Sequence, residues 1–409
     1  MSNTEDREVL LRVENLCQYF KMGKSELKAV DNVSFDIKKG EVFGLVGESG
    51  CGKTTTGRSI IKIYDITSGS IYFKGQRICA GTRSYKDAIK AARKELSALK
   101  SDSPSYEARK KELEESIEKN KEEIKKAKFD HKYSDKLYSD KLVAEVNERY
   151  GKLLEQAKKD NDADKLKELK KKYRDELRVA KNTRLITQIQ MIFQDPIASL
   201  NPRMTVREII SEGLVIQGVR DQKYIDEKVY DILETVGLVR EHAGRYPHEF
   251  SGGQRQRIGI ARSVVMKPDL LIADEPVSAL DVSIQAQVIN LLNELRDSLG
   301  LTILFIAHDL SVVKYFSDRI GVMYFGNMVE LAPSDELFAH PMHPYTRSLL
   351  SAIPLPDPRA EKRRKRITYN ALAAHDYSVD KPSLREIIPG HFVHCNDAEE
   401  AAYRKEFNL

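Results

Sequence analysis

The sequence predicts an α/β protein built around a mostly parallel β-sheet that is covered by helices on both faces. Two observations support this fold class. Short apolar segments of strand length alternate with helical patterns along most of the chain, and a glycine-rich loop joins one such strand to a helix. A third observation, a highly charged block at residues 85–180, lies outside this alternation. We therefore expect an α/β domain that carries a charged helical insertion.

The expected elements follow from hydrophobic patterns taken in chain order. Bounded apolar runs predict strands at Leu11–Glu14, Ser34–Ile37, Val42–Val46, Gly69–Phe73, Gln188–Phe193, Leu270–Asp274, Thr302–Ile306 and Arg319–Tyr324. Apolar residues at helical spacing predict helices at Thr54–Ile63, Val206–Gln217, Lys223–Val236, Gly252–Met266, Val282–Leu299 and Leu310–Phe316. No apolar run approaches the roughly 18 residues that span a bilayer, and the acidic, polar N-terminus lacks a signal-peptide pattern. Any action at a membrane is expected to require other chains.

Composition excludes several classes of protein. The 409 residues carry 67 basic and 62 acidic side chains, a net charge of only +5, so the chain is not a strongly basic nucleic-acid binder. The four cysteines are scattered and form no CxxC pair, which argues against a disulfide framework and a zinc site. A cytosolic setting fits this cysteine usage.

The charged block accounts for the excess of charge in the chain. About half of residues 85–180 are charged, against 32% of the whole sequence and about 25% in typical proteins. Apolar residues recur at helical spacing, with acid and base between them, at Leu113, Ile117 and Ile124, at Leu142, Val146, Tyr150, Leu153 and Ala157, and at Leu166, Leu169, Tyr173 and Leu177. The pattern predicts a thin coiled-coil hairpin with a polar turn near Asp130–Asp140. A mostly solvated, partly disordered helical insert is the alternative.

The loop at residues 47–55 fits the phosphate-binding pattern Gly-x-x-x-x-Gly-Lys-Ser/Thr. Glycines let successive backbone amides turn toward phosphate oxygens, and the N-terminus of the following helix adds a favourable dipole. Lys53 is expected to reach the β- and γ-phosphates, and the Thr54 hydroxyl to ligate Mg²⁺. Cys51 is expected to be a small loop residue and not a nucleophile. The predicted nucleotide-binding residues are Gly47, Ser49, Gly50, Cys51, Gly52, Lys53, Thr54 and Thr55.

An apolar strand that ends in two acids forms the second chemical motif. Asp274, at the tip of the strand Leu270–Asp274, is placed to hold Mg²⁺ directly or through water. Glu275 is one step further along and can orient or deprotonate a water molecule. Together with the phosphate loop, these residues predict metal-assisted phosphoryl chemistry.

Further short motifs carry a resemblance to a known family. Residues Ser251-Gly252-Gly253-Gln254, Gln194 in Phe193–Pro196, Asp281 in Ser278–Asp281, and His308 after an apolar strand occur in a fixed order. They resemble, respectively, the signature, Q-loop, D-loop and switch histidine of ATP-binding-cassette (ABC) ATPases. The likeness covers nearly everything except the charged block and about the last fifty residues.

The resemblance implies an ABC-type P-loop ATPase with a RecA-like core, an antiparallel β subdomain and a helical subdomain near residues 195–265. It implies ATP and Mg²⁺ as ligands, with Glu275, His308, Lys53 and Gln194 as catalytic residues and Gln194 near the metal or the attacking water. Residues 251–254 and Asp281 would face a nucleotide held by a second subunit in a head-to-tail dimer. Phe20 matches the position that stacks on adenine, and Tyr19 is its alternative.

Several stretches resemble one branch of that family. Residues 45–62, 193–203, 249–257 and 343–358 are similar to the ATPase subunits of oligopeptide and dipeptide importers, the F-type subunit in particular. The resemblance implies work at the cytoplasmic face of the cell membrane with a second ATP-binding subunit, two transmembrane permease subunits and an extracytoplasmic peptide-binding protein. The implied domains are 1–84 with 185–330 for the ATPase, 85–180 for the insertion and 331–409 for a C-terminal extension.

The chain departs from the family pattern in two places. The charged insertion carries no transferable function, and we expect it to project from the core toward another protein. Many relatives carry a cysteine-rich C-terminal segment that can hold an iron–sulfur cluster, but here Cys395 is its only cysteine, so we expect no cluster. His391 and His394 lie close to Cys395 in the sequence, but these three residues alone are a weak indication of a metal site.

Two other classes of protein share some of these features. One is a chromosome-maintenance or repair ATPase with a coiled-coil insert, and the other is a soluble translation-associated cassette protein. The repair-type ATPases normally have a much longer coiled coil, and the translation-associated proteins normally have two cassettes in one chain.

Overall fold

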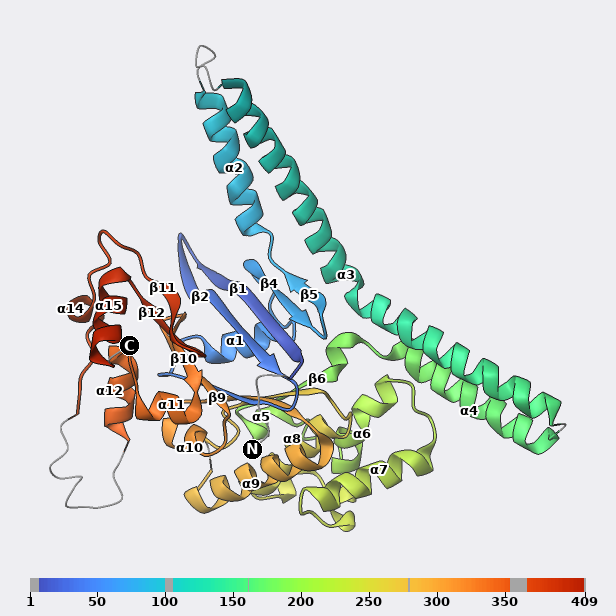
Figure 1. Cartoon of the computed structure of the whole chain (residues 1–409). Helices are drawn as coiled ribbons and strands as arrows, with labels where there is room; N and C mark the ends of the chain where they lie inside the picture. Colours follow the sequence, from blue (N-terminus) through green and yellow to red (C-terminus); the bar gives the residue numbers. More distant parts are fainter. Residues whose placement is uncertain (1–6, 100–105, 161, 279, 354–365, 408–409) are drawn as a thin grey trace. The chain divides into compact units, whose positions relative to one another are not determined.

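The computed structural model describes residues 7–99, 106–160, 162–278, 280–353 and 366–407. Contacts divide the chain into two compact units, one formed by Met1–His131 with Thr302–Leu409 and the other by Lys132–Leu301. Figure 1 shows the path of the chain through both. Across the described ranges, none of the helices combines the length and the apolar character needed to cross a membrane.

The first unit contains two sheets. One is antiparallel, in the order β2-β1-β4-β5, and is formed by β1 (Val9–Met22), β2 (Ser25–Lys38), β4 (Ser68–Phe73) and β5 (Gln76–Ala80). The other has the order β11-β12-β10-β9-β3-β8 and is formed by β3 (Val42–Val46), β8 (Thr302–Ala307), β9 (Arg319–Tyr324), β10 (Asn327–Pro333), β11 (Ser383–Ile388) and β12 (His391–Cys395).

The second sheet of this unit is parallel at its centre. β3 pairs with β8 and β9 in parallel, whereas β9, β10, β12 and β11 pair in antiparallel fashion. Every residue of β3 and β8 is buried, as expected for a parallel strand covered on both faces. The helices of this unit are α1 (Lys53–Ile60), α2 (Arg83–Ala98), α10 (Leu310–Lys314), α11 (Ser334–Ala339), α12 (Pro344–Ala352), α14 (Ala371–Ala374) and α15 (Asp397–Glu406).

The second unit packs helices around a parallel pair of strands, β6 (Ile189–Ile192) and β7 (Leu270–Asp274). Its helices are α4 (Ala163–Asn182), α5 (Pro196–Ser199), α6 (Val206–Ile216), α7 (Gln222–Thr235), α8 (Gly252–Val264) and α9 (Val282–Leu299), with 3₁₀ turns at Leu185–Gln188, Arg240–Gly244 and Pro247–Glu249. Helix α8 is tied to its surroundings by Arg262, which donates to the Ser199 carbonyl at 2.6 Å, and by Ser263, which donates to the Met191 carbonyl at 3.3 Å.

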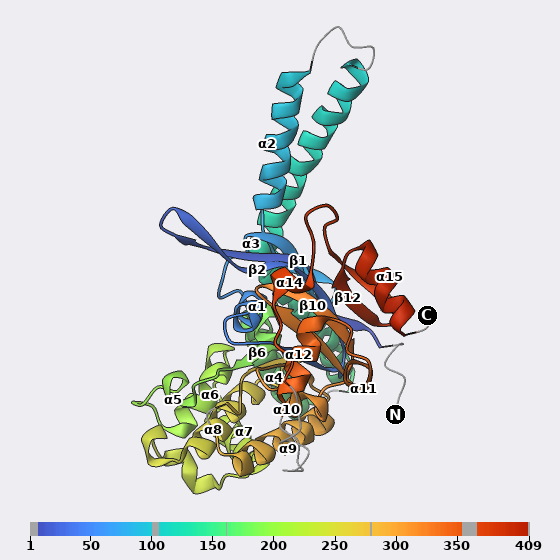
Figure 2. The same cartoon turned by 90° about the vertical axis from the view of Figure 1, so that its left-hand side faces the viewer.

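The insertion is helical, but its turn lies elsewhere than predicted. Helix α3 runs without a break from Tyr106 to Lys159, so the expected turn near Asp130–Asp140 is wrong. That polar stretch contains neither glycine nor proline, and polar side chains at the surface do not by themselves end a helix. Two successive hairpins result: α2 runs beside the first part of α3 (Figures 1 and 2), and α4 runs beside its last part (Figure 1).

Thin apolar seams hold both hairpins together. Between α2 and α3, Ala92, Leu113 and Ile117 form a small buried cluster. Between α3 and α4, the Tyr150 and Tyr173 rings lie 5.4 Å apart, and the Tyr150 hydroxyl donates to Glu176 at 2.5 Å. The prediction that the insertion is a packed helical hairpin, and not a partly disordered segment, is therefore confirmed. The structure contains two such hairpins where one was expected.

The predicted α/β fold is confirmed, including the antiparallel sheet. The strands expected at 42–46, 270–274 and 319–324 and the helix at 282–299 have the predicted limits. The sequence patterns missed four strands, β5, β10, β11 and β12.

Candidate functional site

The phosphate loop lies between β3 and α1, and its glycines adopt conformations that other residues would not tolerate. Gly47, Gly50 and Gly52 have φ values of 151°, 83° and 105°. A Cβ atom on Gly47 would lie 2.2 Å from the Met323 carbonyl oxygen, and one on Gly52 equally close to the Ala29 carbonyl oxygen. The loop thus needs glycine both for its backbone angles and for its close packing.

Lys53 is folded over this loop. Its side chain is buried, with 4% of its surface exposed, and its Nζ donates to the carbonyls of Gly47 at 2.7 Å and Glu48 at 2.9 Å. Thr54 and Thr55 follow in the first turn of α1 and are half-buried. An ammonium group and backbone amides gathered in one loop suit phosphate oxygens.

Cys51 behaves as the small loop residue that the sequence predicts. Its side chain is buried, and burial raises the pKa of its thiol. A thiol held protonated is a poor nucleophile.

In the second unit the structure brings Glu275 and Gln194 together. Every residue of β7 is buried, and Asp274 at its end has no exposed surface. Glu275 follows directly, and its carboxylate accepts a hydrogen bond from Gln194 Nε2 at 3.0 Å. Glu275 has a φ of 44°, a left-handed conformation that is uncommon for a side-chain-bearing residue and is often found at functional positions. The Q-loop glutamine is thus bonded to the candidate base itself.

The signature residues open helix α8 through a capping box. The Ser251 hydroxyl accepts from the Gln254 amide at 3.3 Å, and the Gln254 side chain accepts from the Ser251 amide at 3.1 Å. The Gln254 amide is therefore bonded within the cap of the helix. Gly253 packs tightly, since a Cβ there would lie 2.8 Å from Ile284 Cγ2.

The remaining predicted residues lie at exposed or half-buried positions. Asp281 is the exposed N-cap of α9 in the second unit; Ala279, in the same motif, is outside the described residues. His308 is exposed directly after β8 in the first unit. The motifs thus divide between the units: the phosphate loop, Phe20 and His308 lie in the first, and the acids, Gln194, the signature and Asp281 in the second.

Of the two candidate adenine-stacking rings, Tyr19 is engaged elsewhere. Its hydroxyl donates to Asp31 at 2.5 Å, and burial together with this bond raises the pKa of Tyr19. Phe20, on β1, is half-buried, and its ring meets that of Tyr64 edge-on at a centroid distance of 5.2 Å. Phe20 therefore remains the better candidate.

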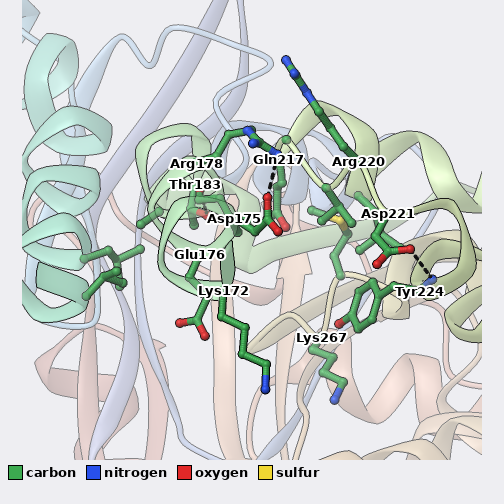
Figure 3. A pocket seen from close by; sticks show the side chains of 18 of the residues that line it. Lys172, Asp175, Glu176, Arg178, Thr183, Gln217, Arg220, Asp221, Tyr224 and Lys267 are labelled. Carbon is green, nitrogen blue, oxygen red and sulfur yellow. Dashed lines mark hydrogen bonds and ion pairs between the residues drawn. The ribbon is translucent and has the colours of Figure 1, made fainter. Parts of the chain in front are cut away.

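A separate groove of about 1020 Å³ lies within the second unit. Its lining includes Lys172, Asp175 and Glu176 of α4 on one side and Asp221 and Tyr224 on the other (Figure 3). No residue of the nucleotide motifs lines this groove. It belongs to the insertion and the helical subdomain and not to the candidate ATP site.

The C-terminal segment uses its histidines and cysteine structurally. His391 Nε2 is hydrogen-bonded with Glu330 at 2.8 Å, and both side chains have no exposed surface. Cys395 is buried, and burial raises the pKa of its thiol to about 12. Among the described residues, no group of three or more His, Cys, Asp or Glu side chains is arranged to hold a metal ion. The sequence also contains a run of five basic residues at 362–366, of which only Arg366 lies within the described residues.

One residue of the phosphate loop has a partner that the motif search did not find. The Glu48 amide donates to the Tyr345 hydroxyl at 3.0 Å. In the sequence, residues 343–358 indicate only a subfamily. The contact of Tyr345 with the phosphate loop joins residues far apart in the chain, so only the folded structure shows it.

Comparison with known proteins places these residues in a family context. The family model described as "ABC transporter" matches residues 30–169 and 152–278, and that described as "Oligopeptide/dipeptide transporter, C-terminal region" matches 329–379. The chain is 46% identical over 397 residues to the oligopeptide transport ATP-binding protein OppF of Bacillus subtilis, which covers 97% of this chain and 99% of the relative. It is 42% identical over 410 residues to the dipeptide transport ATP-binding protein DppF of Lactococcus lactis, covering 99% and 100%.

A solved structure has the same fold. CbiO1 from Clostridium perfringens, part of the ABC transporter complex cbiONQ, superposes with a TM-score of 0.50 at 21% identity, covering 81% of this chain and 91% of that one.

Proposed function

Because the chain belongs to the ABC transporter family, in its oligopeptide and dipeptide branch, we propose that it is the ATP-hydrolysing subunit that powers peptide import. The observation that carries the proposal is the glycine loop, where three glycines at positive φ and a buried Lys53 form a cradle for phosphates. Relatives over nearly the full length are named for oligopeptide or dipeptide transport, which does not favour the chromosome-maintenance and translation alternatives.

In this proposal, ATP binds with its phosphates at residues 47–55 and its base against Phe20. The oxygen donors Thr54, Gln194 and Asp274 suit Mg²⁺, a hard cation that prefers oxygen ligands. Bound there, Mg²⁺ would neutralise charge on the phosphates.

Glu275 is the proposed general base. The Gln194 amide donates to its carboxylate at 3.0 Å, which orients the oxygen that would accept a proton from the attacking water. Lys53 and His308 would stabilise the negative charge that spreads over the transferred phosphoryl group.

The second set of residues serves a partner. Ser251, Gly252, Gly253 and Gln254 at the start of α8, together with Asp281 at the start of α9, would contact a nucleotide bound by a second ATP-binding subunit in a head-to-tail heterodimer. We propose that this dimer docks at the cytoplasmic face of the membrane on two permease subunits that receive peptides from an extracytoplasmic binding protein. The near balance of 67 basic and 62 acidic residues gives no reason to propose nucleic acid as a partner.

Substitution of the loop lysine tests the proposal. Lys53→Ala removes the ammonium group from the cradle, so titration of the full chain with ATP and Mg²⁺ should show at least a tenfold loss of affinity, and the assembled complex should lose peptide uptake. Lys90→Ala, at an exposed position of α2, is the matched control and should bind ATP normally. ATP binding by the Lys53 variant equal to that of the wild type would reject the assignment.

A further inference from the structure

Tyr345 connects the C-terminal extension to the phosphate loop. The residue lies in the first turn of α12, and only 1% of its surface is exposed. Its hydroxyl oxygen accepts from the Glu48 amide at 3.0 Å. The carbonyl of the same Glu48 accepts from Lys53 Nζ at 2.9 Å, so one loop residue is held from both sides, by the extension and by the phosphate-binding lysine.

The Tyr345 ring is fixed by its surroundings. Its centroid lies 4.4 Å from that of Tyr324 on β9 and 5.5 Å from that of Tyr369. Burial raises the pKa of Tyr345, so its hydroxyl stays protonated and neutral. A buried ring with tightly packed aromatic neighbours has little freedom to rotate, and its hydroxyl therefore offers a fixed acceptor.

The start of α12 is anchored by a buried carboxylate. Glu330 on β10 accepts from the amides of Met342 at 2.8 Å and His343 at 3.1 Å, and it is paired with His391 of β12. His343 caps the helix, since its Nδ1 accepts from the Tyr345 amide at 3.1 Å. A continuous set of hydrogen bonds, buried except at the Glu48 end, thus leads from the C-terminal strands to the phosphate loop.

We propose that Tyr345 is a positioning residue that holds the phosphate loop in its nucleotide-binding conformation, so that the C-terminal extension sets the affinity of the chain for nucleotide. The inference rests on the proposed ATP site. A loop with Gly47 and Gly50 at positive φ has many accessible conformations, and ordering it on phosphate binding costs entropy. A bond that selects the binding conformation beforehand reduces that cost.

The hydroxyl can be tested separately from the ring. Tyr345→Phe keeps the aromatic packing and removes only the acceptor of the Glu48 amide. The matched control is Tyr369→Phe, which removes a hydroxyl from the same aromatic cluster but not the one bonded to the loop. Both variants are made in the full chain, and binding of ATP with Mg²⁺ and of ADP is measured by calorimetry, with thermal unfolding recorded in parallel.

We expect Tyr345→Phe to weaken nucleotide binding by about three- to tenfold, as for the loss of one hydrogen bond, with a midpoint of thermal unfolding close to that of the wild type. In the assembled complex, KM for ATP should rise by a similar factor while kcat at saturating ATP changes much less. Tyr369→Phe should bind as the wild type does. Wild-type affinity and KM in Tyr345→Phe would overturn the inference, whereas a wild-type chain that binds no nucleotide would instead contradict the proposed function.

Discussion

The buried strands and the charged insertion keep their shape by different physical means. In β3, β7 and β8 every side chain is out of water, and apolar burial contributes about 25 cal/mol per Å² to stability. Helix α3 has 54 residues, yet its buried side chains are few: Leu113, Ile117, Ala127, Ser134, Tyr150 and Ala157. The insertion depends on backbone bonds, thin seams and exposed ion pairs such as Lys152–Glu148, which contribute little to stability because water screens them. The same substitution should therefore have very different effects in the two regions.

The largest difference between the two regions is expected when a glutamate is replaced by glutamine. Glu275→Gln keeps an oxygen for the Gln194 bond but removes the proton acceptor, so ATP turnover by the assembled complex should fall by about 10²–10⁴-fold while ATP still binds. Glu176→Gln in the insertion alters a carboxylate that faces Arg149 and Tyr150 on a hairpin surface, and turnover should stay close to wild type. Phosphate release measures both. Near-normal turnover in the Glu275 variant would remove the proposed base.

A second contrast concerns stability. Ile306→Ala in β8, where the side chain has no exposed surface, should lower the free energy of unfolding by about 2–5 kcal/mol. Ile117→Ala, in the narrow seam between α2 and α3, leaves a smaller cavity that water can enter, and we expect about 1–2 kcal/mol, confined to the hairpin. Denaturant unfolding reports the first effect and amide hydrogen exchange of α3 the second. Equal losses would mean that the insertion has a core as well packed as the sheet.

The smallest contrast concerns two histidines at acid pH. Burial, with His375 and His394 nearby, lowers the pKa of His343 to about 3. The folded state thus prefers the neutral imidazole, and the stability from this site is present above the unfolded pKa of about 6.5 and is lost as pH falls toward 3. At pH 5.5 the loss should be on the order of 1 kcal/mol.

The matched substitutions are His343→Asn, which retains a helix-capping side chain, and His131→Asn at an exposed position of α3. Thermal unfolding at pH 7.5 and 5.5 should show a smaller acid-induced loss in His343→Asn than in the wild type, and the wild-type loss in His131→Asn. A wild-type acid response in both variants would show that His343 does not contribute to it.

The strands that the sequence predicted and those it missed differ in physical character. β3, β7 and β8 are continuous apolar runs, because both of their faces are covered, and such runs are visible without any knowledge of neighbours. β10 contains Glu330, whose carboxylate is buried only because Met342, His343 and His391 bond to it. A charged residue inside a strand obscures the apolar pattern by which a strand is recognised. In the structure, Phe325 and Gly326 have positive φ and form the turn that precedes β10.

The motifs were visible in the sequence because each is local. The loop 47–55, the acids after β7 and the start of α8 carry their chemistry within a few residues, so spacing alone indicates what they can bind. The capping box of Ser251 was equally local, and the glutamine three residues after a serine could have indicated it.

By itself the sequence determined the α/β class, the helical character of the insertion and the nucleotide motifs, since periodicity and short motifs depend on neighbours along the chain. Only the tertiary structure decided that α3 passes through Asp130–Asp140 unbroken, that Gln194 bonds Glu275 across 81 residues, and that Tyr345 bonds Glu48 across 297. These contacts depend on which surfaces meet when the chain folds. A local sequence pattern shows which side of a helix or strand is apolar, but it does not show which distant segment packs against that side.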